Sequence, residues 1–377
     1  YYLKLPIKDY DLEVYGIESL EDLETILTQY GSVNLVGKSF GILKFTHEKE
    51  EYDFSFPRRE SKIGSGHRGF DVKIDSSMSF KEASLRRDFT INAMGYDIQN
   101  KIFLDPYCGL ADIKQKTLRA VNSKTFVEDP LRVYRAVQFC ARFNYKLDKY
   151  TFLLSQKMVK NGLLQTISKE RIYTEFTKLL LKSPQPSIGL KLMKKLGIFS
   201  YFQELENNDF QELDAMVKFL DSDKKSNLIF MLSVLCHTMG IENTKSFLTK
   251  LTNENRLTTK IVTFVKYYQT PSKLFNAKVD DKEIRKLATK IDITDLVKVT
   301  KVYSPSAGEW LLQSAKDLKV DKKALSPLLR GKDLINLGVK PSPKFKEILD
   351  KVYALQMEGV VVDFESALEM AKSKYLP

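Results

Sequence analysis

Two acidic residues near the start of the chain are two positions apart, in the segment Asp9-Tyr10-Asp11-Leu12-Glu13. Successive side chains of a β-strand point to opposite faces, so a strand here places Asp9, Asp11 and Glu13 on one face. Carboxylates in this arrangement can bind a pair of Mg²⁺ ions, which prefer hard oxygen ligands and also hold phosphate groups. Exposed strand faces are often acidic, so the spacing alone does not establish a metal site.

A third acid for such a site is Asp53, in the alternating segment Glu51–Phe56. If this segment forms a strand beside the first one, Asp53 could orient or deprotonate an attacking hydroxyl group. Glu51 lies on the same face of that strand and competes for the role. The alternative for both acids is an ordinary solvated position on a strand.

Two further segments combine basic and acidic residues. Arg86-Arg87-Asp88 opens the octapeptide that ends at Ala93, and it offers guanidinium groups for phosphate and a carboxylate for ribose hydroxyls. Residues 128–135 predict the start of a helix, with acids where the helix dipole favours them. Asp129, Arg132 and Arg135 follow an i, i+3, i+6 spacing and would share one face. The structural alternative is a capped helix with an ion pair between residues 128 and 132.

The composition restricts the class of protein. With 60 Lys and Arg against 48 Asp and Glu, the 377-residue chain has a net charge of +12, which favours a nucleic acid partner. A protein that is merely basic is the alternative. The length predicts two to four domains. No apolar run is long enough to cross a bilayer and no signal peptide is visible, so we expect a soluble protein without a membrane partner.

Cysteine and histidine are scarce. Cys108, Cys140 and Cys236 are far apart and lie in apolar surroundings, so we expect reduced packing residues, no disulfide and a cytoplasmic location. The chain has three histidines, which leaves little material for a histidine metal centre or a Ser-His-Asp triad.

The pattern of apolar residues predicts an α+β fold. Residues 1 to about 120 contain short alternating segments at Tyr10–Tyr15, Val33–Phe45 and Glu51–Phe56, typical of a small mixed sheet with helices. From about residue 125 the periods become helical, as in Leu131–Phe143, Ile172–Leu181 and Lys344–Gln356, so we expect the remainder to be all helical.

The octapeptide Arg86–Ala93 and the Asp9-x-Asp11 pair together resemble the class II tRNA nucleotidyltransferases and bacterial poly(A) polymerases, a branch of the polymerase β superfamily. Val36–Gly41 is similar to the central strand turn of that family, and Arg58–Phe70 to its mobile loop. Asp105–Asp112 resembles the motif that links the catalytic head to a helical neck. The resemblance covers nearly the whole chain, although it is weak between about residues 200 and 320.

The resemblance implies a role for each matching residue. Arg87 would clamp phosphate and Asp88 would contact ribose. Asp129 and Arg132 would hydrogen-bond the edge of the incoming base, so that the protein serves as template, while Arg135 would face ribose or phosphate. Glu170 and Arg171 lie in a segment that resembles a brace of the neck, and we expect them to be structural. Tail lysines are expected to contact the tRNA backbone, namely Lys332, Lys340, Lys344 and Lys346.

The resemblance also implies the architecture and the reaction. We expect a nucleotidyltransferase head at 1–120, a base-selecting neck at 121–185, a body at 186–272 and a tRNA-binding tail at 273–377. The predicted activity is template-independent addition of CCA to the 3′ end of tRNA from CTP and ATP, with two Mg²⁺ ions. The alternatives are A-adding, CC-adding or poly(A) activity, and, from another class, a catalytically inactive RNA-binding protein. The sequence predicts no oligomeric state.

The chain departs from the family pattern at two places. Members begin with a Gly-Gly turn and an Arg-Asp pair just before the acidic strand, whereas this sequence starts at Tyr1, so we expect that its N-terminal part is missing. Some relatives carry a phosphohydrolase domain marked by a His-Asp pair. Here His237 is followed by Thr238, so we predict no phosphatase activity and a packing role for His237.

Overall fold

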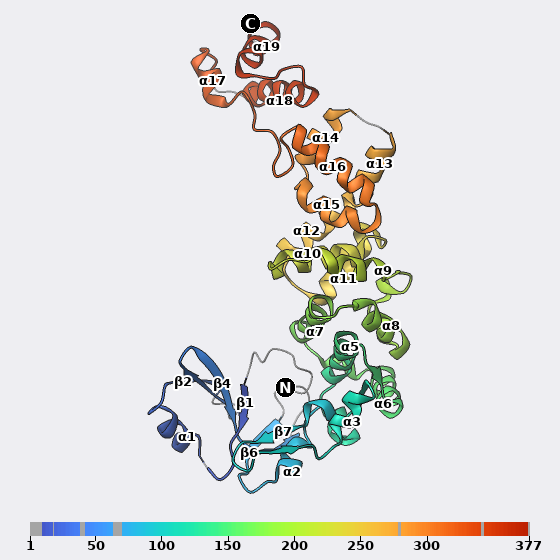
Figure 1. The fold of residues 1–377 in the computed structure, drawn as a ribbon. Helices are drawn as coiled ribbons and strands as arrows, with labels where there is room; N and C mark the ends of the chain where they lie inside the picture. Colours follow the sequence, from blue (N-terminus) through green and yellow to red (C-terminus); the bar gives the residue numbers. More distant parts are fainter. Residues whose placement is uncertain are drawn as a thin grey trace. The chain divides into compact units, whose positions relative to one another are not determined.

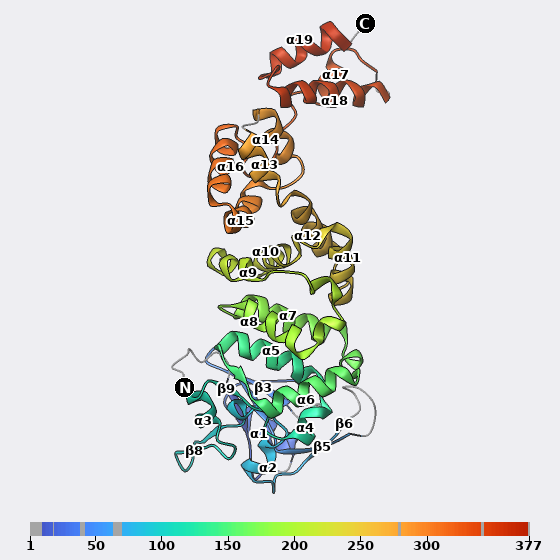
Figure 2. The same ribbon diagram turned by 90° about the vertical axis from the view of Figure 1, so that its right-hand side faces the viewer.

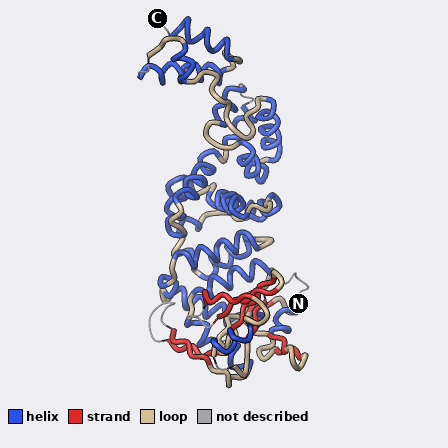
Figure 3. The backbone as a smooth tube through the Cα atoms, turned by 90° about the vertical axis from the view of Figure 1, so that its left-hand side faces the viewer, coloured by secondary structure: helices blue, strands red, loops and turns tan. Residues whose placement is uncertain are grey.

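The computed structural model describes residues 10–17, 19–37, 42–62, 70–277, 280–340 and 343–375. The chain divides into two compact units, the first formed by Tyr1–Ser183 with Ile188–Ser200 and the second by Pro184–Ser187 with Tyr201–Pro377. Within the described ranges every strand belongs to the first unit, as Figure 3 shows. The fold is α+β, as predicted: a small N-terminal mixed sheet with helices, followed by a mainly helical chain.

The main sheet of the first unit has four strands in the order β1-β4-β3-β2 (Figure 1). Strand β1 runs parallel to β4, and the other neighbours are antiparallel. The strands are β1 (Tyr10–Glu13), β2 (Ser32–Gly37), β3 (Ile42–His47) and β4 (Glu50–Ser55). The alternating segment predicted at 33–45 therefore forms two strands, β2 and β3, and residues 38–41 between them lie outside the described part.

One face of this sheet packs against helix α1 (Leu20–Leu27), which begins where the Ser19 hydroxyl accepts a hydrogen bond from the backbone N–H of Asp22. The buried cluster between them consists of Leu23, Leu27, Leu43, Phe45 and Phe56. Since side chains alternate along a strand, the residues between the apolar ones are directed to the opposite face. The acids of β1 and β4 therefore lie on the face that α1 does not cover.

The rest of the first unit links this sheet to a group of helices. Its further strands are β5 (Arg58–Lys62), β6 (Phe70–Ile74), β7 (Gly95–Asp97), β8 (Ile102–Leu104), β9 (Thr117–Leu118) and β10 (Lys146–Leu147). Its helices are α2 (Phe80–Ser84), α3 (Gly109–Lys114), α4 (Ser123–Glu128), α5 (Leu131–Phe143), α6 (Lys149–Lys160), α7 (Lys169–Lys182) and α8 (Pro186–Leu196), whose first two residues belong to the second unit. The prediction of an all-helical chain after residue 125 is wrong at β10, because this short strand pairs in parallel with β9.

Helices α5, α7 and α8 pack closely, and Figure 2 shows them side by side. Gly189 of α8 makes this possible, because a Cβ atom there would lie 2.4 Å from Cδ1 of Leu179 and 3.2 Å from Cβ of Ala141. Helix α5 has the bounds predicted for it, and the predicted helical segment 172–181 lies inside α7.

Helices and the loops between them make up the described residues of the second unit. Its helices are α9 (Gln211–Met216), α10 (Lys224–Cys236), α11 (Gly240–Leu251), α12 (Asn255–Tyr267), α13 (Thr270–Ala277), α14 (Asp281–Ala288), α15 (Ile293–Tyr303), α16 (Pro305–Asp317), α17 (Gly331–Asn336), α18 (Pro343–Glu358) and α19 (Phe364–Tyr375). Every residue of α10 from Asn227 onward is buried, because this helix packs against α9, α12 and α15. None of the helices in the described ranges has the length and apolar character required to span a membrane.

Candidate active site

Two of the predicted catalytic acids lie side by side on neighbouring strands. Asp11 of β1 is in register with Asp53 of β4, and because the strands are parallel the two side chains share a face. Asp11 is exposed, and the side chain of Asp53 is 41% exposed. Lys44 of β3 pairs with Asp53 in the next strand and places its Nζ 3.5 Å from Oδ1 of that carboxylate. The strand pairing required for the Asp53 prediction is thus present, whereas Asp9 lies outside the described residues.

Glu13, the third acid on this face of β1, is bonded to two other side chains of the protein. One carboxylate oxygen of Glu13 lies 3.4 Å from the Arg86 guanidinium, and the other accepts a hydrogen bond of 3.2 Å from the Tyr15 hydroxyl. Burial, followed by the charge of Glu13, raises the pKa of Tyr15 well above its ordinary value, so this hydroxyl stays protonated and remains a donor. Glu13 therefore connects strand β1 to the basic segment, residues Arg86-Arg87-Asp88, and does not present a free carboxylate.

Asp88 of that basic segment is buried and heavily hydrogen-bonded. Its Oδ1 accepts bonds from the Phe89 backbone N–H (2.9 Å) and the Asn92 amide (3.0 Å). Its Oδ2 accepts a bond of 2.6 Å from Nε of Arg135, whose guanidinium also lies over the ring of Phe139. The two residues predicted to surround the ribose are thus brought together across a separation of 47 positions in the sequence.

Arg87, next to Asp88, is partly exposed and has no ion-pair partner among the residues that the structure describes. A guanidinium in this state is well suited to bind an external anion such as phosphate.

Asp129 does not belong to the helix predicted for it. It follows α4 in an extended conformation, and α5 begins two residues later at Leu131, whose backbone N–H donates to the Asp129 carboxylate at 3.2 Å. The shared helical face predicted for Asp129, Arg132 and Arg135 is therefore wrong for Asp129. Instead, Nη2 of Arg171 on α7 donates to both carboxylate oxygens, at 2.9 and 3.1 Å. No pattern in the sequence predicts this ion pair, beyond the expectation that Arg171 braces the neck.

Arg132, in the first turn of α5, bonds to two backbone carbonyl groups. Nη1 donates to the carbonyl oxygen of Thr125 at 2.7 Å, and Nη2 donates to that of Arg86 at 2.5 Å. The Thr125 hydroxyl in turn donates to the Leu85 carbonyl at 3.1 Å. Arg132 thus connects α5 to α4 and to the basic segment. Sequence periodicity cannot predict these two hydrogen bonds, because they join separate elements.

These contacts form one continuous site in the first unit. The acidic face of β1 reaches Arg86 through Glu13, and Arg86 reaches the start of α5 through Arg132. This chain of contacts connects strand β1, which carries Asp11, to Arg132 at the start of α5. Among the described residues, no group of three or more His, Cys, Asp or Glu side chains could hold a metal ion. The exposed, aligned oxygen donors of Asp11 and Asp53 nonetheless suit a hard divalent cation.

Other predicted residues lie outside this region. The four tail lysines are all exposed in the second unit, on or beside α17 and α18. The ring of His237 is packed, as expected, and stacks on Tyr268 at 4.3 Å with its Nε2 3.2 Å from Glu212. Cys140 and Cys236 are buried free thiols, and burial raises the pKa of Cys140 to about 12. Cys108 is exposed, so its predicted packing role is wrong.

Three protein-family models match the chain in sequence order. They are the poly A polymerase head domain at residues 1–119, the RNA and SrmB-binding site of polymerase A at 144–208, and domain 2 of tRNA nucleotidyltransferase at 224–371. Together they cover the head, helices α6 to α8 and most of the second unit, whereas residues 120–143 with α4 and α5 lie between the first two matches.

Curated relatives agree with these models. The multifunctional CCA protein of Neisseria gonorrhoeae is 37% identical over 191 residues, which is 50% of this chain and 44% of the relative. That of Mannheimia succiniciproducens is 35% identical over 198 residues, or 52% of this chain and 45% of the relative. The alignment thus spans less than half the length of these relatives.

Solved structures share the fold over almost the whole chain. The CCA-adding enzyme of Bacillus stearothermophilus in complex with CTP has a TM-score of 0.74 at 22% identity, covering 98% of this chain and 90% of that one. The Thermotoga maritima CCA-adding enzyme complexed with tRNA has a TM-score of 0.66 at 20% identity, covering 98% and 87%.

Proposed function

Because this chain belongs to the family of tRNA nucleotidyltransferases and poly(A) polymerases, we propose that it adds CCA to the 3′ end of tRNA from CTP and ATP. One observation carries the proposal: the aligned acids of β1 and β4 are linked through Glu13 and Arg86 to Arg132, at the start of the predicted base-selecting helix. The relatives named for CCA addition, and the shared fold of enzymes solved with CTP and with tRNA, support it.

The reaction is attack by the 3′ hydroxyl of the RNA on the α-phosphorus of the nucleotide. A bond forms between that oxygen and phosphorus, the bond to the β-phosphate bridge breaks, and pyrophosphate leaves. Asp9 and Asp11 would hold Mg²⁺, which supplies charge neutralisation on the triphosphate and acidifies the attacking hydroxyl. Asp53, in register with Asp11, would accept the proton, and its Oδ1 lies 3.5 Å from Nζ of Lys44, which helps to orient the carboxylate.

The basic segment would bind the phosphate and the ribose of the nucleotide. Arg87 has a guanidinium without a described acidic partner and binds phosphate. A carboxylate can accept about four hydrogen bonds, and Asp88 uses three within the protein, so a ribose hydroxyl can take the fourth. Arg135 fixes the orientation of that carboxylate and contributes positive charge beside it.

The base is selected by Asp129 and Arg132. An aspartate only accepts hydrogen bonds and an arginine only donates them, so together they match the mixed edges of cytosine and, after a small shift, of adenine. Arg171 holds Asp129 through both carboxylate oxygens, which limits how far that shift can go.

The decisive test is nucleotide addition by Asp11→Ala. The variant should lose CTP and ATP incorporation while keeping its fold and its tRNA affinity, because Asp11 is an exposed strand residue whose side chain has no described hydrogen bond or ion pair. Glu50→Ala, which removes an exposed acid at the start of β4, is the matched control and should extend tRNA normally. Comparing Asp53→Asn with Glu51→Gln then decides which acid of β4 accepts the proton. Addition by Asp11→Ala at the wild-type rate would exclude the proposed site.

Sister activities use the same kind of site. An A-adding, CC-adding or poly(A) enzyme would differ in which tRNA ends it extends, so labelled CTP and ATP should be supplied separately to tRNA ending before, within and after CCA. A catalytically inactive RNA-binding protein would extend none of them in the presence of Mg²⁺.

The proposal extends to the domains and the tRNA contacts. It assigns catalysis to 1–120, base selection to 121–185, the body to 186–272 and tRNA binding to 273–377, within the cytoplasm. The exposed tail lysines Lys332, Lys340 and Lys344 would contact the tRNA backbone, because exposed cations on a chain of net charge +12 attract phosphate.

A further inference from the structure

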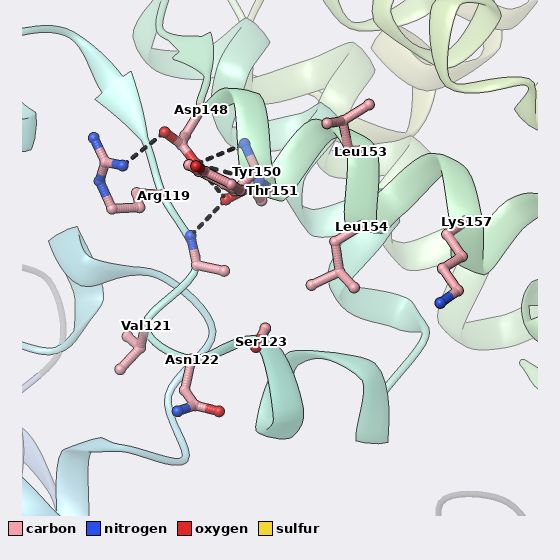
Figure 4. Close-up of a pocket in the computed structure, with 11 residues that line it drawn as sticks. Arg119, Val121, Asn122, Ser123, Asp148, Tyr150, Thr151, Leu153, Leu154 and Lys157 are labelled. Atoms are coloured by element: carbon pink, nitrogen blue, oxygen red, sulfur yellow. Dashed lines mark hydrogen bonds and ion pairs between the residues drawn. The ribbon is translucent and has the colours of Figure 1, made fainter.

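A cavity of the first unit lies between residues 119–123 and helix α6, with a volume of about 470 Å³ (Figure 4). None of its lining residues belongs to the candidate active site described above. Its wall is mainly apolar and includes Val121, Leu153 and Leu154. The volume lies in the range of cavities that bind small organic ligands.

The walls of this cavity are held rigidly. Arg119 donates to Asp112 through Nε at 3.2 Å and to Asp148 through Nη1 at 2.6 Å. Asp148 caps α6 by accepting from the backbone N–H groups of residues 150 and 151, and the Thr151 hydroxyl accepts from the Ala120 N–H at 3.0 Å. A cavity whose walls are fixed before a ligand arrives loses little entropy on binding.

Helix α6 presents an apolar face to solvent beside this cavity. Tyr150, Leu153, Leu154 and Lys157 are spaced i, i+3, i+4, i+7 and all line it. The side chain of Tyr150 is 80% exposed and that of Leu153 is 51% exposed, so neither is needed for the core. Tyr150 therefore lies about two helical turns from Lys157, with Leu153 and Leu154 between them (Figure 4). Exposed aromatic rings and cations along one face are the groups on which proteins that bind single-stranded RNA stack bases and hold phosphates.

Polar groups at the rim of the cavity can bind the polar parts of a nucleotide. Asn122 uses its Oδ1 to cap α4, which leaves the amide nitrogen out of the cap, and Ser123 contributes a hydroxyl. Lys157 is exposed and has no acidic partner among the described residues, so it can bind a phosphate. We propose that this cavity binds one unpaired nucleotide, with its base stacked on Tyr150 and its phosphate on Lys157. The inference rests on the proposed function, since it concerns a second contact with the RNA substrate or a free nucleotide.

Helix α4 connects this cavity to the candidate active site. Its first residue, Ser123, lines the cavity, and the carbonyl of Thr125 two positions later holds Arg132. A nucleotide that orders the start of α4 therefore also steadies the carbonyl group to which the base-selecting arginine bonds.

The two sources of the nucleotide are distinguished by cross-linking in EDTA, where no addition can occur. Full-length protein is irradiated with tRNA that lacks CCA and contains 4-thiouridine, or with 8-azido-AMP, and the labelled peptides are identified by mass spectrometry. Labelling of the peptide that contains Tyr150 by the tRNA supports an RNA nucleotide, and labelling by 8-azido-AMP supports a free one. If neither probe labels that peptide, the proposal is overturned and the face is left as a protein-docking surface.

Substitutions give a second measurement. Tyr150→Ala should abolish the cross-link, and with RNA as the source it should weaken tRNA binding by at least about fivefold, as expected for one lost stacking contact. Tyr150→Phe keeps the ring and should bind normally. Tyr96→Ala removes another exposed tyrosine of the first unit, 58% exposed on β7, and is the matched control. Equal labelling of Tyr150→Ala and Tyr96→Ala refutes the site.

The assays also separate this inference from the proposed function. Wild-type protein that extends tRNA in Mg²⁺ but does not cross-link at Tyr150 disproves the second site alone. Protein that cross-links there but extends no tRNA disproves the proposed reaction alone.

Discussion

Replacing Arg135 should loosen the basic segment by a measurable amount. Arg135 supplies the only cationic partner that we find for the buried Asp88 carboxylate among the described residues, at 2.6 Å. Arg135→Met keeps the stem that lies against the ring of Phe139 and removes the charge. Arg142→Met is the matched control on the same helix, because the Arg142 guanidinium also lies over a ring, that of Phe143, but has no described carboxylate partner.

The magnitude follows from the burial of the two side chains. Removing one partner of a fully buried ion pair costs about 3–5 kcal/mol, because the other charge is left without compensation. The side chain of Asp88 is 8% exposed, but that of Arg135 is 31% exposed, so solvent screens part of the attraction. Two hydrogen bonds to Asp88 also remain. We therefore expect a cost of about 2 kcal/mol for Arg135→Met and less than about 0.5 kcal/mol for Arg142→Met.

Hydrogen exchange at the Phe89 amide is the appropriate assay, since this N–H donates to Asp88 and reports opening of the segment without requiring two-state unfolding of both units. A cost of about 2 kcal/mol corresponds to exchange roughly 30 times faster in Arg135→Met. If exchange at Phe89 changes by less than about threefold, or by the same factor in Arg142→Met, the ion pair does not stabilise the segment and the reasoning is refuted.

Two further predictions follow. Arg171→Met should remove the bonds that hold Asp129 and increase incorporation of UTP and GTP relative to CTP and ATP by about tenfold. A loss of stability alone would lower the incorporation of all four nucleotides equally. Unchanged selectivity would show that Arg171 does not position Asp129. A thiol reagent applied to the folded protein at pH 8 should modify Cys108 within minutes and leave Cys140 and Cys236 unmodified. Burial raises the pKa of both buried thiols and removes the reactive thiolate. Early modification of either buried cysteine, detected by mass spectrometry, would contradict the structure.

Local periodicity was sufficient to predict several parts of this protein. The alternation around Asp11 predicted a strand with acids on one face, and the apolar spacing of residues 131–143 predicted the bounds of α5. These features depend on residues within a few positions of one another, so the backbone geometry of a strand or helix already fixes which side chains share a face. Local spacing was wrong at Asp129, where α4 ends and a turn intervenes before α5.

The contacts that make a site were decided by tertiary structure. Asp53 reaches Asp11 through strand pairing, Arg132 reaches Arg86 across 46 positions, and Arg171 reaches Asp129 across 42. No spacing rule within one element predicts such pairs, because they depend on which elements pack together. The sequence by itself determined which residues could do chemistry and, apart from Asp129, on which strand or helix the described candidates of the first unit lie. Only the folded chain decided which carboxylates are exposed, as Asp11 is, and which are bonded to arginine within the protein, as Glu13 and Asp88 are.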